Sequence, residues 1–167
     1  MTGYAVKAID GMEAIFHGSF RRAGAELGVE SFGMQIFDMP PDFADYPEHD
    51  HADDGQEEVY VVLRGTVELE VDGRRSMLDP GRIAHVGPGT RRKLHPGPNG
   101  ARVLALGGVP GQVYSRPADF RLGAPDPTLA SHETARASHE TARASHETAR
   151  ASHESGRVST ATSGQPR

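Results

Sequence analysis

The middle of the chain alternates between apolar and polar positions over several short stretches. Residues 59–63 form an apolar run rich in β-branched side chains, which is typical of a buried strand. Residues 66–71 alternate strictly between apolar and polar residues, which is typical of a half-exposed strand, and they end at the turn signal of residues 72–73. With residues 64–65 as the connecting turn, the pattern predicts a β-hairpin.

Further short strands are predicted on both sides of this hairpin. They cover residues 32–39, 82–86 and 103–106, with edge strands inside 1–17. Proline and glycine predict turns at 79–81 and at 96–100. Strands of this length, separated by turn signals every eight to twelve residues, favour an antiparallel sandwich or barrel.

One stretch near the N-terminus changes to a helical period. Residues 19–27 place their apolar side chains three and four positions apart, which predicts a short amphipathic helix. Ser19 is the expected cap and Gly28 the expected stop. Arg21 and Arg22 fall on the polar side, and we interpret them as a solvated face.

The C-terminal segment differs in kind from the rest of the chain. A seven-residue repeat, SHETARA, begins at Ser131, Ser138 and Ser145, and it contains no large apolar residue that could form a coiled-coil seam. We therefore predict one folded domain over residues 1–122 and a disordered low-complexity tail over 123–167. The repeats carry evenly spaced histidines that could chelate a metal weakly: His132, His139, His146 and His153.

Charge and composition exclude several classes of function. The net charge of −5 resides in residues 1–122, because the tail carries five residues of each sign, and an acidic body has no electrostatic basis for binding nucleic acid. The absence of cysteine excludes disulfides and thiolate chemistry. The longest aliphatic or aromatic run is five residues and the start lacks a signal-peptide pattern, so we expect no membrane segment and a cytoplasmic protein.

The strongest candidate chemistry lies just before the apolar run. His49 and His51 are one residue apart and point to the same face of an extended segment. Glu58 follows at the mouth of the predicted hairpin. Two imidazoles and one carboxylate on one side of an ion suit non-haem Fe(II), and they also accept Mn, Ni, Co, Cu or Zn.

This arrangement resembles a known family. His49-x-His51, then Glu58, then six residues and Gly65 is similar to the first motif of the cupins, and the glycines of the second motif are matched by Gly81 and Gly89. The resemblance implies an all-β fold, a small antiparallel double-stranded β-helix or jelly-roll barrel, here with the short N-terminal helix. It also implies a pocket inside the barrel in which a divalent transition metal (Fe, Mn, Ni or Zn) binds.

The chain departs from the cupin pattern at four positions. Arg92 stands where the second-motif histidine would be, Gly87 replaces a proline and Phe43 replaces a glycine. In addition, the gap from His51 to Glu58 is two residues longer than usual.

Arg92 leaves two alternatives open, because a guanidinium cannot ligate a metal. In the first, Arg92 pairs with Glu58 or Glu57, and the metal-free protein is a non-catalytic module that senses or binds a small ligand. In the second, the histidines and Glu58 retain the metal, and Arg92 binds an anionic group of the substrate. Tyr60 and Val62 are expected to line the pocket in either case. The leading hypothesis is a small-molecule-binding protein with a metal site that acts on a small anionic substrate as a dioxygenase or isomerase type of enzyme.

Other residues were weighed for the same site and for a partner surface. His85 shares a strand face with Ile83 and could enter the barrel, and His95 lies near a predicted turn, but we interpret both as ordinary polar residues. Arg64 is expected to reach solvent. An apolar outer face is expected to pack against the other sheet or against the mate in a homodimer; its residues are Val59, Val61 and Leu63.

Overall fold

A computed structural model describes residues 3–128 of the chain. The chain divides into two compact units, Met1–Pro127 and Thr128–Arg167. The predicted disorder of the repeats lies outside the described residues, and the domain boundary at Leu122 stays a prediction. No helix within residues 3–128 is long and apolar enough to span a membrane.

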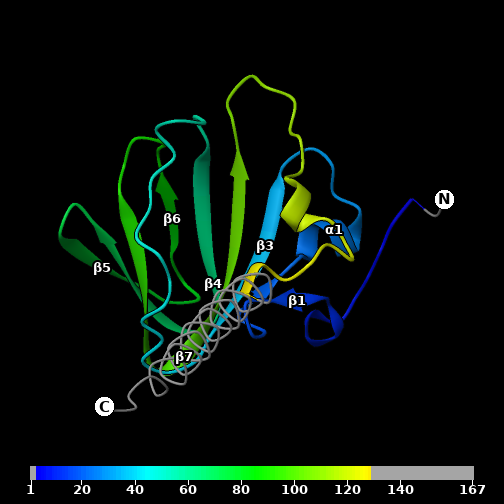
Figure 1. The fold of residues 1–167 in the computed structure, drawn as a ribbon. Helices are drawn as coiled ribbons and strands as arrows, with labels where there is room; N and C mark the ends of the chain where they lie inside the picture. Colours follow the sequence, from blue (N-terminus) through cyan, green and yellow to red (C-terminus); the bar gives the residue numbers. More distant parts are fainter. Residues whose placement is uncertain (1–2, 129–167) are drawn as a thin grey trace, which may run out of the picture. The chain divides into compact units, whose positions relative to one another are not determined.

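The described part is built almost entirely from antiparallel strands, which confirms the predicted fold class (Figure 1). In the sheet the strands follow the order β1-β2-β3-β7-β4-β5, and β6 pairs with β4. The strands are β1 (Ala14–Ile15), β2 (Phe20–Arg21), β3 (Gly33–Met39), β4 (Glu57–Val71), β5 (Arg74–Leu78), β6 (Ile83–Val86) and β7 (Arg92–Gly108). The helices are α1 (Ala23–Leu27) and the 3-10 turns η1 (Ile9–Gly11) and η2 (Ala118–Phe120).

The predicted hairpin over residues 59–71 is wrong, because β4 runs through it as one strand of 15 residues. Where a turn was expected, the pairing of β4 with β7 shifts register on both sides of Gly65. Gly65 has φ +76°, and a Cβ there would lie 2.1 Å from the carbonyl oxygen of Gly100. The glycine therefore marks a β-bulge with a close backbone approach, not the end of a strand. The turn predicted at 96–100 is wrong for the same reason, since β7 continues through it.

The bulges change which side chains of β4 face the core. Before them the even-numbered Tyr60 and Val62 are buried, and after them the odd-numbered Val67 and Leu69 are buried. One extra residue restores the inward face on a strand that bends, so both halves of β4 contribute to one core. That core is completed by Phe37, Met39, Tyr46, Leu78, Val86, Leu94, Ala101, Val103 and Ala105.

The tight turn expected at Asp72 and Gly73 is confirmed, and it joins β4 to β5. Both residues have positive φ, 48° and 75°. A turn with two such residues twists in the sense that an antiparallel hairpin requires, and Asp-Gly adopts it readily.

The N-terminal helix is present but shorter than predicted. Residues 20–21 form β2, and the hydroxyl of Ser19 donates to the carbonyl of Phe16 instead of capping a helix. Gly28 ends α1 with φ 70°, as expected. Apolar side chains of this region pack on the outer face of β3, where they form a second cluster with Ile36.

The two arginines of this region do not form a solvated face, which corrects that interpretation. The side chain of Arg22 is fully buried, pairs with Glu13, and donates from Nε to the carbonyl of Asp119 at 2.9 Å and from Nη2 to that of Pro125 at 3.3 Å. Arg21 Nε donates to Asp38 at 2.6 Å. The periodicity did not reveal this because the covering segment comes from about a hundred residues later in the chain.

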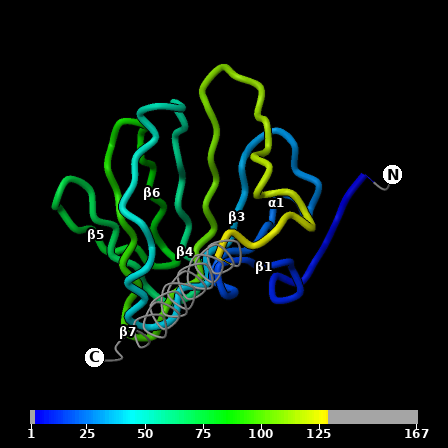
Figure 2. The backbone as a smooth tube through the Cα atoms, in the orientation of Figure 1, coloured from blue at the N-terminus to red at the C-terminus, as the bar shows by residue number. Residues whose placement is uncertain are grey.

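Residues 40–56 connect β3 to β4 and run beside the start of β7 (Figure 2). His49 and Arg92 form an isolated antiparallel bridge, with N···O distances of 3.1 and 2.9 Å between their backbones. The backbone N–H of His51 donates to the carbonyl of Pro88 at 2.7 Å. This pairing holds both histidines against the strand that carries Arg92.

Candidate metal and ligand site

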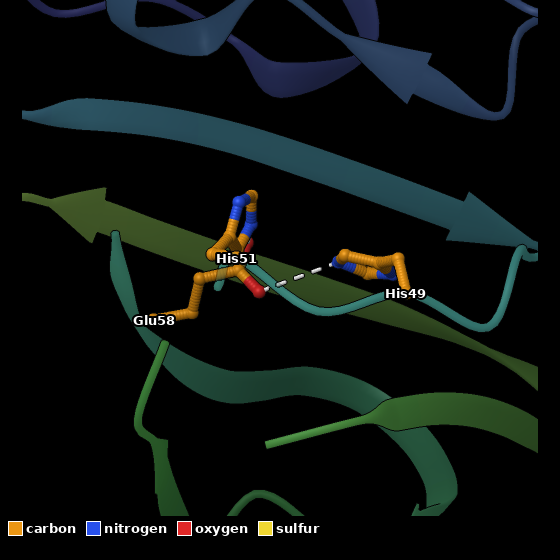
Figure 3. A group of neighbouring side chains, drawn as sticks. All are labelled: His49, His51 and Glu58. Atoms are coloured by element: carbon orange, nitrogen blue, oxygen red, sulfur yellow. Dashed lines mark ion pairs between the residues drawn. The ribbon is translucent and has the colours of Figure 1, made fainter. Parts of the chain in front are cut away.

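His49, His51 and Glu58 come together although they lie on different elements. The histidines are on the segment that pairs with residues 88–92, and Glu58 points inward from β4. One ligand atom from each residue lies within 4.8 Å of the others. Figure 3 shows both imidazoles turned toward the Glu58 carboxylate.

The imidazoles are oriented by contacts on their far side. His49 Nδ1 lies 3.2 Å from the carbonyl oxygen of Pro47, and His51 Nδ1 lies 3.1 Å from Oδ2 of Asp54. A proton on each Nδ1 satisfies these acceptors and leaves each Nε2 facing Glu58, at 3.5 Å from Oε2 for His49 and 3.6 Å from Oε1 for His51. Histidines that ligate metals are commonly held in this way through the other ring nitrogen.

Glu58 is anchored through only one of its two oxygens. Arg92 Nε donates to Oε2 at 3.0 Å, and Arg92 Nη2 and the hydroxyl of Tyr60 donate to the same atom. Arg92 Nη1 donates to the carbonyl of Thr90 at 3.1 Å. The ion pair that the sequence left open is thus present, and Oε1 remains turned toward His51.

The surroundings keep this carboxyl group ionised. Burial raises the pKa of Glu58, but hydrogen bonds from His49, Tyr60 and Arg92 outweigh it and lower the pKa to about 2. Burial, together with the Glu58 charge, raises the pKa of Tyr60. At neutral pH Glu58 is therefore an anion and Tyr60 a neutral donor.

The residues fit a divalent metal. Ligands bound at about 2.0–2.1 Å around one ion lie roughly 3.0–3.5 Å apart, close to the separations between each Nε2 and Glu58. The donor set of two neutral imidazoles and one carboxylate suits first-row transition metals. The Arg92 contact does not compete with the ion for Oε1.

Sequence reasoning missed two residues beside this cluster. The amide nitrogen of Gln56 lies 3.1 Å from His51 Nε2, so a metal at His51 requires this amide to turn, which would present its oxygen. Gln56 is two residues before Glu58 and shares its strand face, a signal that could have identified it. Tyr46 is buried with its ring 5.8 Å from that of His49, and no local pattern indicates this contact.

The other histidines lie elsewhere. His85 is exposed and its Nε2 lies 3.1 Å from Glu57 Oε2, so its entry into the barrel is wrong. Its neighbour Val86 takes the inward position of β6 instead. His95 Nε2 lies 2.8 Å from Glu70 Oε2. Arg64 is exposed, as expected.

Tyr60 and Val62 face the barrel interior, with exposed fractions of 0 and 2%. They pack beside Glu58 on the same face of β4. Their position agrees with the expected wall of a ligand site, while their contact with a ligand stays a prediction.

The fold and the site define a small antiparallel β-barrel with a candidate three-residue metal site on its inner face. Residues 35–107 match the cupin domain family. The chain therefore contains a domain of the cupin superfamily.

Similar solved structures agree with this assignment at the level of the fold. A cupin protein from Bacteroides fragilis is 17% identical with a TM-score of 0.52, over 70% of this chain and 93% of that one. KdgF from Halomonas sp. is 18% identical with a TM-score of 0.42, over 47% of this chain and 69% of that one. The DMSP lyase DddQ from Ruegeria pomeroyi is 23% identical with a TM-score of 0.43, over 51% of this chain and 42% of that one. Comparison with curated proteins gives no match.

Proposed function

We propose that this protein binds one divalent transition metal through His49, His51 and Glu58 and uses it to bind a small anionic molecule inside the barrel. The observation that supports this most strongly is the shared orientation of the two imidazoles. Each holds its Nδ1 against an oxygen and directs its Nε2 to a different oxygen of Glu58. Such preorganisation lowers the cost of assembling the ligands around an ion.

The protein groups around the ion have distinct tasks in this proposal. Tyr60 and Arg92 hold Oε2, so that Oε1 is presented in one direction. Tyr60 and Val62 provide the apolar and hydroxyl-bearing wall. A bound Fe, Mn, Ni or Zn ion would supply Lewis acidity to an oxygen of the bound molecule. Catalysis of the dioxygenase or isomerase type is the finer form of the proposal.

Metal content of the full chain tests the proposal. The tail histidines are first replaced by alanine, so that they cannot contribute: His132, His139, His146 and His153. This background is expected to hold about one equivalent of a transition metal by elemental analysis after incubation with Fe(II), Mn(II), Ni(II) or Zn(II). The further double variant His49→Ala/His51→Ala is expected to lose it. Unchanged metal content in that variant would refute the site.

A second candidate, a metal-free ligand-binding or sensing module, is favoured by one observation. The buried Glu58 already has a complete partner in Arg92, so the interior is electrically satisfied without an ion. Ligand binding that survives chelation of all metal would support this candidate. Turnover that disappears on metal removal and returns with one specific metal would exclude it and establish an enzyme.

The homodimer and the cytoplasmic location also remain predictions. The proposed contact face includes Leu63, which is 41% exposed, beside Ile83 of β6, which is 71% exposed. Sedimentation at micromolar concentration would test this. A monomer there would argue against the dimer.

A further inference from the structure

The charge of Glu58 is cancelled inside the barrel before any ion binds. Its partner Arg92 has no exposed side-chain surface, and the side chain of Glu58 is only 10% exposed. Because solvent is excluded from both, the pair acts as a neutral unit toward groups placed nearby. The two histidines add no charge when they are neutral ligands.

A divalent ion bound at this site would therefore keep its full charge of two. The pairing with Arg92 uses Oε2, while Oε1 points to His51, so ion binding need not displace the arginine. Three protein donors also leave coordination positions open for a second molecule. Net charge and open positions both favour a ligand with two negative oxygens.

The remaining charges close to the site weaken this field only slightly. The Asp54 carboxylate contacts His51, but its side chain is 60% exposed, and water screens exposed charges. Glu57 is 47% exposed and faces His85 on the outside of the barrel. Arg91 is exposed and pairs with Glu48, so it adds no comparable positive field.

Resting on the metal site proposed above, we infer that the molecule bound there is a small dianion that binds through two oxygens, of the dicarboxylate type. Arg92 selects it by field and not by contact. The guanidinium is fully buried and donates to Glu58 and Thr90, so it supports the charge of the centre from behind.

Two matched chelators test the inference. Malonate carries two charges, and 3-hydroxypropanoate has a similar length and two oxygen donors but carries one charge. Both are titrated into the Co(II)-loaded full chain with the tail histidines replaced, and the visible absorption of Co(II) reports binding. The measured quantity is the ratio of the two dissociation constants.

The variants separate charge from packing. Arg92→Met is expected to lower the preference for malonate by about tenfold or more, because it removes one positive charge from a poorly solvated site. Arg92→Lys keeps the charge and should retain most of the preference. Arg91→Met removes the same charge from an exposed neighbour and should leave the ratio unchanged. Equal ratios in all four proteins would overturn the inference.

The unsubstituted site gives a second test that does not depend on the folding of a variant. Its preference for malonate should equal or exceed that of aqueous Co(II), since both centres carry a charge of two. A preference about tenfold weaker than that of the aqueous ion would also overturn the inference. Failure to bind Co(II) at all would instead refute the metal site, so the two failures are distinguishable.

Discussion

Arg92 Nε donates to Glu58 Oε2 at 3.0 Å, although the two residues belong to opposite ends of the long β4–β7 pair. In the strand register Arg92 lies opposite Val71, and Glu58 lies opposite Gly107. On a flat sheet the 13 positions from Glu58 to Val71 would separate the two side chains by roughly 40 Å. The contact therefore exists only because the bulges near Gly65 fold the two halves of the pair over one core.

Replacing Arg92 should cost far more stability than replacing its neighbour. Arg92→Met leaves a buried carboxylate without its partner, and we expect a loss of about 3–5 kcal/mol in the free energy of unfolding. Arg91→Met removes an exposed ion pair and should change it by less than about 0.5 kcal/mol. Urea unfolding of both variants at pH 7 measures the difference. Similar losses would show that Arg92 is not needed to neutralise Glu58.

Acid should destabilise the protein partly through Glu58. The folded state holds the pKa of Glu58 at about 2, below the ordinary value of 4.5, so the unfolded chain takes up this proton first. The contribution is complete above about pH 4.5 and is lost as the pH falls toward 2. It amounts to roughly 3 kcal/mol at most.

The variant Glu58→Gln isolates this contribution. Its unfolding free energy should be lower at pH 6 and should fall less than that of the unsubstituted protein between pH 4.5 and 2. Glu48→Gln, at an exposed carboxylate, should follow the unsubstituted curve. Parallel curves for all three proteins would contradict the lowered pKa of Glu58.

Gly65 should tolerate no side chain. Both Gly65 and Gly73 have positive φ, but a Cβ at Gly65 would lie 2.1 Å from the Gly100 carbonyl oxygen, whereas nothing lies within 4 Å of one at Gly73. Gly73→Ala should cost about 1 kcal/mol for its backbone conformation. Gly65→Ala adds the steric clash and should cost at least about 3 kcal/mol. Thermal or urea unfolding that gives equal losses would mean that the bulge is not tightly packed.

Arg22 should fasten the segment after β7 to the N-terminal hairpin. Its guanidinium reaches the carbonyls of Asp119 and Pro125, and Arg22→Met leaves these and Glu13 without their donor. We expect a loss of roughly 3 kcal/mol and faster proteolysis between residues 117 and 126. Arg121→Met, at an exposed position, is the control. Unchanged cleavage in the Arg22 variant would show that other contacts hold the segment.

The residue pattern by itself determined the class of fold and the candidate ligands. Alternation at period two identified the strand character of residues 59–71, and the Asp72-Gly73 pair identified the turn to β5, because both signals depend on near neighbours in the chain. The one-residue spacing of His49 and His51, and the position of Glu58 before an apolar run, likewise needed only local geometry. The cupin resemblance rested on the same residues and is confirmed.

The tertiary structure decided what local patterns cannot contain. Gly65 reads equally as a turn or as a bulge, and only the approach of Gly100 from another strand distinguishes them. Arg22 reads as a surface residue until the segment of Asp119 and Pro125 covers it. Arg92 reads only as a missing histidine until barrel closure brings its guanidinium to Oε2 of Glu58. In each case the deciding contact comes from a distant part of the chain, and burial there changes the energetic meaning of a residue whose neighbours in sequence stay the same.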